Sequence, residues 1–391
     1  MLLDLRGLCV GYIECGADGG PAYVRKDILG DLGKVDVVVF DCDGVLLDVR
    51  RSYIRAVAWT VGALVEAFTG TAVPEGLLDP ELCHAYKRTG GFNNDWGLAY
   101  ALAMRIMAEA PGDAVREVNR VAEEATRFND PRERLDYIRR RRPGARIPLD
   151  GLRGRLLGFA GELDESGPEA ADRLLCGVFE PVRRALAWRG GVGECLVSTM
   201  FEEALLGRRL FEEQYGEPAG FTDADEGFVE GGRVVVTEAT FRGLASVLGG
   251  PRLGVASGSM RGTALHLLGG LMDHVPREAQ VWHGDVDEAA KKTGDVGLHK
   301  PGPYSLLRAC EPYRPFSRAL YVGDTAADRA MARRAGEGFL FAGVYGFTHS
   351  PESSMREFLE SGCDVVAPTV NDLPGILSTV RMGPRPIQLG P

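Results

Sequence analysis

The sequence lacks long apolar segments. No run approaches the roughly 18 consecutive apolar residues that a membrane-spanning helix needs. The N-terminal segment MLLDLRGLCVGYIECG carries an early acid and no basic leader, which argues against a secretory signal. From these absences we expect a soluble, cytoplasmic protein with no membrane partner.

Closely spaced cysteines are also missing. The eight cysteines stand at positions 9, 15, 42, 83, 176, 195, 310 and 363. They form no CxxC pair and no cluster at the spacing of a zinc site. We expect reduced, mostly buried thiols, while composition leaves open whether any of them pair.

Positive charge is in deficit, with 45 Lys and Arg against 55 Asp and Glu and a net charge of -10. Such a chain repels nucleic acid on average, so a nucleic-acid partner is not expected, and an anionic substrate needs a local positive group or a metal ion. One stretch is strongly biased: residues 131–146 contain seven arginines. We interpret it as a solvated helix face and linker in preference to an anion-binding site.

What the sequence does contain is typical of a globular α/β protein. Its 391 residues favour two domains, or one core with a large insertion. Continuous apolar, β-branched runs predict buried parallel strands, and helical patterns separate the later ones. These runs occupy residues 35–40, 251–258, 318–324 and 338–346. The pattern predicts a doubly wound, Rossmann-like parallel sheet.

A different pattern fills the middle of the chain, where helical periodicity dominates and strand runs are few. We therefore predict a large, mainly α-helical cap at 49–237, inserted after the first core strand, and a catalytic core formed by 35–48 and 238–382. Residues 1–34 read as an N-terminal extension with a hairpin. The tail GPRPIQLGP reads as an extended or frayed end.

The first chemical signal is DCDG, directly after the strand predicted at 35–40. Ligands of open α/β sheets bind outside the carboxyl ends of strands, and an i, i+2 pair points both side chains the same way. Asp41 could attack a substrate while Asp43 handles protons, and Gly44 allows a sharp turn beneath a bound phosphate. Taken alone, the segment reads equally well as a polar turn with an N-cap.

Three later segments add to this signal. Ser257 and Gly258 stand at the end of a second strand run, where a hydroxyl and backbone N–H groups suit a phosphoryl oxygen. Lys300 in GLHKPGP could neutralise the phosphate and the attacking carboxylate. Asp324 and Asp328 in GDTAAD could hold a hard cation such as Mg²⁺, or could simply cap a helix. The order of all four segments, each at the end of a strand, favours phosphoryl chemistry.

At these residues the chain resembles the haloacid dehalogenase superfamily. DCDGVLLD is similar to its first motif, Ser257 to its second, Lys300 to its third and GDTAAD to its fourth. The resemblance implies that Asp41 forms an aspartyl-phosphate and that Asp43 protonates the leaving group and then activates water. It also implies that Mg²⁺ is held by Asp41, the backbone carbonyl of Asp43 and Asp324, with Asp328 as a supporting acid.

The same resemblance narrows the activity. Dehalogenase members lack a carboxylate at the position of Asp43, so hydrolysis of a small phosphorylated metabolite is favoured over dehalogenation. The position of the insertion resembles the helical-cap subfamily I, which includes phosphoglycolate phosphatases and beta-phosphoglucomutase. A phosphomutase, or a binding protein that retains the fold, therefore stays open as an alternative.

Within the predicted cap, residues 87–102 and 205–216 resemble a branch of phosphoglycolate-phosphatase-like proteins. A polar and aromatic cluster there could close over the leaving group and bind substrate. Its members are Lys87, Arg88, Asn93, Asn94 and Trp96. For Asn94 a role as the N-cap of a helix that starts near Trp96 is an equal alternative.

Overall fold

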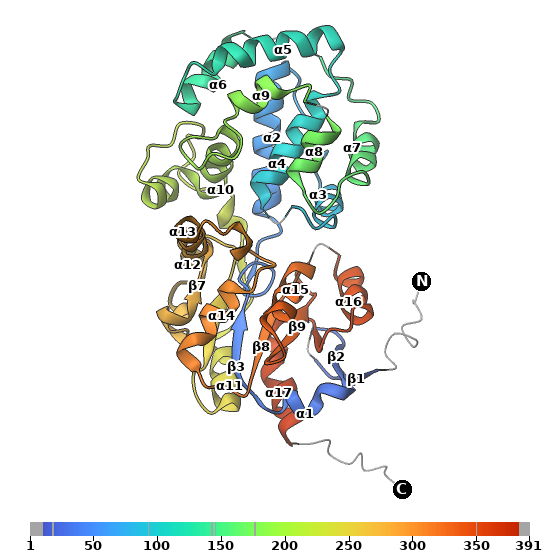
Figure 1. Ribbon diagram of the computed structural model, residues 1–391, viewed down its shortest axis with the longest axis vertical. Coiled ribbons are helices and arrows are strands. Elements are labelled where there is room, and N and C mark those ends of the chain that lie inside the picture. The colour runs from blue at the N-terminus through green and yellow to red at the C-terminus, as the bar shows by residue number, and fades with distance from the viewer. Residues whose placement is uncertain are drawn as a thin grey trace. The chain divides into compact units, whose positions relative to one another are not determined.

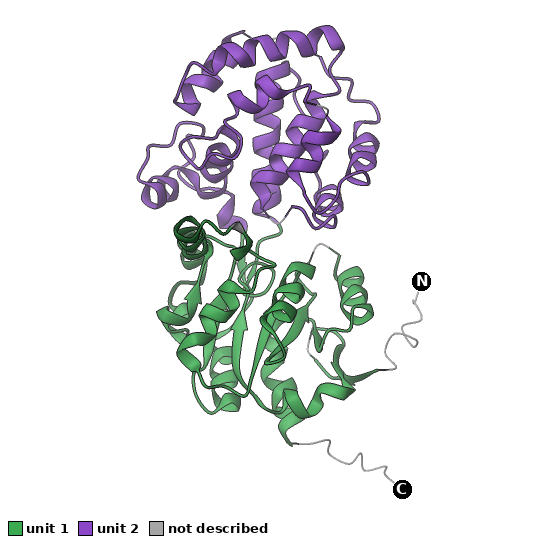
Figure 2. Cartoon of the chain, in the orientation of Figure 1, with its two compact units in different colours: residues 1–50, 232–391 green, residues 51–231 purple. Residues whose placement is uncertain are grey.

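The computed structural model describes residues 11–382 except 18, 93, 142, 143, 145, 176 and 349 (Figure 1). The C-terminal tail, which was predicted to be frayed, therefore lies outside the described residues. Cys9 and Asn93 also lie outside them. The chain divides into two compact units, one drawn from 1–50 and 232–391 and the other from 51–231 (Figure 2). Within the described part of the chain, no helix is long and apolar enough to cross a membrane.

The first unit is built on a sheet of eight strands, counted among the described residues, in the order β1-β2-β10-β9-β8-β3-β6-β7. The six strands from β10 to β7 are parallel, and the hairpin β1-β2 joins the β10 edge antiparallel. The strands are β1 Tyr12–Cys15, β2 Ala22–Arg25, β3 Val35–Phe40, β6 Leu253–Ala256, β7 Gln280–Val281, β8 Arg318–Gly323, β9 Phe339–Val344 and β10 Val365–Ala367. The four predicted strands and the expected hairpin are confirmed, whereas β7 and β10 were not predicted.

Helices cover both faces of this sheet, because the central strands are apolar on both sides. In β3, Val38 and Phe40 face one core, while Val37 and Val39 face the other. The helices over the first core are α1 Leu29–Leu32, α11 Glu238–Leu248, α12 Arg261–Leu268 and α17 Leu373–Met382; those over the second are α13 His283–Thr293, α14 Tyr304–Cys310, α15 Ala326–Ala335 and α16 Pro351–Glu360. The doubly wound α/β fold is therefore confirmed.

A small two-stranded sheet lies where the chain leaves this unit and returns to it. β4 (Leu47–Asp48) pairs antiparallel with β5 (Arg233–Val234). Short 3-10 helices complete the unit: η1 Lys26–Ile28, η3 Gly269–His274, η4 Arg277–Ala279, η5 Val296–Leu298, η6 Glu311–Tyr313 and η7 Val370–Asp372.

Among its described residues, the second unit contains helices joined by loops and no strand. Its long helices α2, α4, α5 and α10 were all predicted from their apolar periodicity. The elements are α2 Tyr53–Thr69, α3 Pro80–Lys87, α4 Asp95–Met107, α5 Gly112–Ala125, α6 Pro131–Arg141, α7 Leu152–Ala160, α8 Pro168–Leu174, α9 Glu180–Ala185, α10 Leu196–Tyr215 and η2 Phe228–Gly231. In α10, Gly207 interrupts the helical backbone with φ 72° and ψ 168°, conformations that glycine reaches without strain.

The arginine-rich stretch corrects one prediction. Arg139, Arg140 and Arg141 are exposed, as a solvated helix face requires. Arg134, however, is buried and donates hydrogen bonds to the backbone carbonyls of Ala185, at 2.8 Å, and Glu194. Five guanidinium N–H donors allow one side chain to tie several carbonyls together, so this arginine is part of the packing of the helical unit.

The cysteines behave largely as expected. The six described cysteines are free thiols; five are buried and Cys15 is partly exposed. Cys42 lies between the two acids of the DCDG segment and packs in the core of the α/β unit. Burial, followed by the charges of Asp43 and Asp41, raises the pKa of the Cys42 thiol well above its ordinary value, so the thiol stays protonated and acts as an apolar side chain.

Candidate active site

Three neighbouring parallel strands bring the predicted residues to one edge of the sheet. Asp41 follows β3, Ser257 follows β6 and Asp324 follows β8, and β3 lies between the other two. The sheet hydrogen bonds continue into these residues: the N–H of Asp41 donates to Val322 O at 2.8 Å, and the N–H of Ser257 donates to Val281 O at 3.0 Å. The backbone at the start of the site is therefore fixed by the sheet itself.

Lys300 is the central cation of the site. Its Nζ lies 2.8 Å from Asp41 Oδ1 and 2.8 Å from Asp328 Oδ1. The three side chains are 15%, 11% and 1% exposed, so these ion pairs are largely shielded from solvent. Burial opposes the charge on Lys300, but Asp328 and Asp41 outweigh it and raise the pKa of this ammonium. Lys300 is therefore a permanent positive charge beside Asp41.

Asp328 is held in place by two further groups. Its Oδ2 accepts hydrogen bonds from the backbone N–H of Thr325 at 3.1 Å and from Thr325 Oγ1 at 2.6 Å, forming a capping box at the start of α15. The hydroxyl of Tyr321 lies 3.0 Å from Asp328 Oδ1. Burial raises the pKa of Asp328, but Lys300 and the hydrogen bonds outweigh it and lower the pKa below its ordinary value. Asp328 therefore stays ionised and positions Lys300.

Gly44 makes room for Asp324. The glycine has φ 77°, and a Cβ built on it would lie 2.0 Å from Asp324 Oδ2. A side chain at position 44 would therefore have to displace the carboxylate, in addition to the strain of its left-handed backbone. The requirement for glycine in the DCDG segment comes from this close approach.

Asp43 is connected to the end of β6 by a chain of hydroxyls. Ser259 Oγ donates to Asp43 Oδ2 at 2.8 Å and lies 2.9 Å from Ser257 Oγ. The backbone N–H of Ser259 donates to Ser257 Oγ at 3.2 Å. A Cβ built on Gly258 would meet no other atom within 4 Å. Contact of its backbone with a phosphate stays a prediction.

Three aspartates lie close together in the site, and one lysine does not balance their negative charge. Single carboxylate oxygens of Asp41, Asp324 and Asp328 lie within 4.8 Å of one another. Burial, followed by the charges of Asp328 and Asp41, raises the pKa of Asp324 well above its ordinary value. Burial also raises the pKa of Asp41, although Lys300 opposes this. Such a cluster has the oxygen donors and the excess negative charge that attract a hard cation.

Three of the predicted residues of the helical unit, Lys87, Asn94 and Trp96, have partners within that unit. Lys87 Nζ lies 2.8 Å from Asp95 Oδ1. Asn94 accepts a hydrogen bond from the N–H of Trp96 at 2.7 Å and caps α4, and Trp96 Nε1 donates to Glu202 Oε1 at 2.9 Å. Arg88 is exposed. The capping alternative for Asn94 is thus what the fold uses, and contact of this cluster with a substrate stays a prediction.

The sequence reasoning missed three residues of the site. Thr325 could have been found, because TAAD has the spacing of a capping box. Ser259 stands two residues after Ser257 and carries no signal that separates it from a turn. Tyr321 lies inside an apolar strand run, where an aromatic residue reads as core.

The sequence matches a known protein family. A family pattern for haloacid dehalogenase-like hydrolases matches residues 35–336. A search of curated proteins finds no match to the sequence.

Two solved structures are similar to the chain. An X-ray structure of a Northeast Structural Genomics Consortium target, ZR25, is 18% identical, with a TM-score of 0.61, over 88% of this chain and 98% of that one; this likeness concerns the fold alone. A protein from Bacteroides fragilis described as a haloacid dehalogenase-like hydrolase is 16% identical over 87% of this chain and 100% of its own, but its TM-score of 0.38 carries no weight. The family pattern matches a range that includes Asp41, Lys300 and Asp324, and it shows that the chain belongs to the haloacid dehalogenase-like hydrolases.

Proposed function

We propose that this hydrolase is a magnesium-dependent phosphatase that acts on a small phosphorylated metabolite and is similar to phosphoglycolate phosphatases of helical-cap subfamily I. The observation that carries the proposal is the position of Lys300, 2.8 Å from both Asp41 and Asp328. A fixed ammonium beside a carboxylate suits the approach of a phosphate dianion to a negatively charged nucleophile.

The metal would occupy the acid cluster. Asp41, the backbone carbonyl of Asp43 and Asp324 would hold Mg²⁺, because oxygen donors are the ligands that Mg²⁺ prefers. The raised pKa of Asp324, caused by burial and by its acidic neighbours, supports this, since a bound cation would favour the ionised carboxylate. When bound, Mg²⁺ would screen the charge of the phosphate.

The residues of the chain would then carry out two displacements. The carboxylate of Asp41 attacks phosphorus as the ester P–O bond breaks, and Asp43 gives its proton to the departing oxygen. Asp43 next takes a proton from water, whose oxygen attacks the phosphorus of the aspartyl-phosphate and releases inorganic phosphate. Ser259, which donates to Asp43 Oδ2, would orient that carboxyl, while Lys300 stays charged throughout.

Phosphate release from a panel of small metabolites tests the proposal. The panel should include two- and three-carbon acid phosphates, sugar phosphates and amino-alcohol phosphates, each with Mg²⁺ and with excess chelator. We expect metal-dependent release from at least one class, and loss of about 10⁴-fold or more in Asp41→Asn, since that variant removes the nucleophile. Asp27→Asn is the control, because Asp27 pairs with Arg25 on the surface.

Two results would count against the proposal. An isomerised sugar phosphate without free phosphate would indicate a phosphomutase. No product from any substrate, in a folded protein, would indicate a binding protein.

A further inference from the structure

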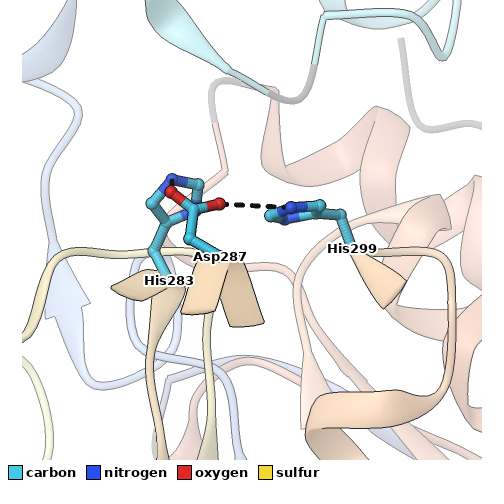
Figure 3. Close-up of side chains that lie close together, drawn as sticks. All are labelled: His283, Asp287 and His299. Atoms are coloured by element: carbon cyan, nitrogen blue, oxygen red, sulfur yellow. Dashed lines mark ion pairs between the residues drawn. The ribbon is translucent and has the colours of Figure 1, made fainter. Parts of the chain in front are cut away.

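A second group of metal-ligating side chains lies in the α/β unit, apart from the acids already described. His283 and Asp287 stand four residues apart on α13, and His299 lies in the loop that follows (Figure 3). Asp287 Oδ2 lies 3.3 Å from His283 Nε2, and Asp287 Oδ1 lies 3.2 Å from His299 Nε2. One donor atom from each residue falls within 4.8 Å of the others. The two rings and the carboxylate therefore lie close enough together to bind one ion.

We propose that His283, Asp287 and His299 form a binding site for a zinc-class divalent ion. Two imidazoles and one carboxylate suit Zn²⁺, whereas Mg²⁺ prefers oxygen ligands and its own waters. At bond lengths of about 2.0–2.1 Å, two ligands of a tetrahedral zinc lie about 3.3–3.4 Å apart. Each histidine Nε2 lies close to that distance from an oxygen of Asp287, His283 from Oδ2 and His299 from Oδ1. Three protein ligands leave the fourth position to water.

The position of the side chains gives an ion access to them. His283 and His299 both turn Nε2 toward Asp287, and an imidazole nitrogen is a common metal ligand. The side chains of His283, Asp287 and His299 are 22%, 39% and 38% exposed. An ion can therefore reach the site from solvent, and a water ligand has room.

The proposed zinc site is linked to the Lys300 site on two sides. His299 directly precedes Lys300 in the chain. The backbone N–H of His283 donates to Ser259 O at 3.1 Å, and Ser259 Oγ donates to Asp43. A bound ion would join α13 to the loop that carries Lys300, so we expect it to restrain that loop. The zinc proposal does not depend on the phosphatase activity.

Zinc titration of the full chain tests this site. The protein is stripped with chelator and titrated with Zn²⁺ against a chromophoric competitor in excess Mg²⁺. We expect one zinc equivalent, and a loss of at least about 10–100-fold in affinity in His283→Gln and in His299→Gln, because even residues that only support a metal ligand cost that much when changed. Hydrogen exchange in residues 294–303 should slow when zinc binds to the parent protein.

Two variants identify where the zinc binds. Asp324→Asn removes a carboxylate of the acid cluster and should leave zinc affinity unchanged. His274→Gln changes a histidine that lies 3.7 Å from Glu238, and should also have no effect. Parent-like zinc affinity in both His283→Gln and His299→Gln, or loss of zinc binding in Asp324→Asn, would overturn the proposal, as would a parent protein that takes up no zinc.

Discussion

The two units of the chain bury carboxylates in opposite ways. In the α/β unit, Asp41, Asp324 and Asp328 converge within 4.8 Å and share Lys300. In the helical unit, the side chain of Glu203 is fully buried, yet its Oε2 accepts hydrogen bonds from three successive backbone N–H groups, those of residues 220, 221 and 222, at 2.9, 2.6 and 3.3 Å. Its neighbour Glu202 accepts from Trp96.

This difference separates a reactive site from a structural one. Backbone donors bind one carboxylate oxygen of Glu203 and Arg132 Nη2 lies 3.6 Å from the other, so groups of its own unit compensate the burial of this side chain. The convergent aspartates keep an excess of negative charge, which raises the pKa of Asp324 through burial and its acidic neighbours. Groups perturbed in this way are typical of functional sites. The predictions below test whether the two arrangements respond differently to the loss of one charge.

The largest combined effect on activity and stability is expected for Lys300→Met. This change keeps the length of the side chain but leaves Asp41 and Asp328 without their cation. We expect phosphate release to fall about 100- to 1000-fold and the free energy of unfolding to fall by about 3–5 kcal/mol, because the partners of a broken buried ion pair remain buried. Turnover and chemical denaturation measure the two effects.

Two companion variants sharpen this result. Asp41→Asn removes the nucleophile, so it should abolish activity. Because it also removes one of the converging negative charges, we expect no comparable loss of stability. Lys34→Met breaks an exposed ion pair with Asp31 and should alter neither quantity measurably. If the Lys300→Met protein is as stable and as active as the parent, the aspartates of the α/β unit do not depend on their cation, and the two units do not bury carboxylates in different ways.

A smaller effect, confined to stability, is expected for Glu203→Gln. The amide has one acceptor oxygen in place of two and no charge for the three N–H donors, so the free energy of unfolding should fall by about 1–3 kcal/mol. Activity per folded molecule should stay at the parent level. Glu212→Gln on the same helix is the matched control, because the side chain of Glu212 is exposed and accepts from the N–H of Ala219 at 3.2 Å. Equal losses in the two variants would contradict the structural role of Glu203.

The sequence predicted those parts of the fold that local pattern determines. β3 and β8 each contain four consecutive apolar residues, VVVF and ALYV, and the long helices repeat their apolar positions, so both kinds of element were found. β7 and β10 are two and three residues long. Strands this short are defined by their pairing with β6 and β9, and that pairing is a property of the tertiary structure.

The same division holds for the candidate site. Asp41, Lys300 and Asp328 were found because each stands in a motif, and the structure brings them into contact. The buried Arg134 was mistaken for a surface residue, because a run of arginines gives no sign that one of them contacts backbone carbonyls of α9 and the loop after it. The approach of His299 to α13 could not be predicted, since nothing in the local sequence relates residue 299 to residue 283.

The last expected effect concerns Glu202; it is no larger than that of Glu203 and depends on pH. Burial, opposed by the hydrogen bond from Trp96, raises the pKa of this carboxyl to about 7 from an ordinary value of 4.5. Between these values the folded state holds a proton that the unfolded state releases, so this contribution to stability is complete below about pH 4.5 and is lost as the pH rises through about 7. Glu202→Gln keeps the neutral form at every pH. Relative to the parent, the variant should therefore gain about 1–3 kcal/mol in unfolding free energy between pH 5 and about pH 8.

Denaturation of both proteins, followed by tryptophan fluorescence, measures this difference, because the indole of Trp96 donates directly to Glu202. The difference between the two curves is informative, since every other titrating group is common to both proteins and cancels. A constant difference across the whole pH range would mean that Glu202 is already ionised in the folded state. The helical unit would then bury a carboxylate that its fixed donors satisfy only in part, and its contrast with the aspartate cluster would be one of degree.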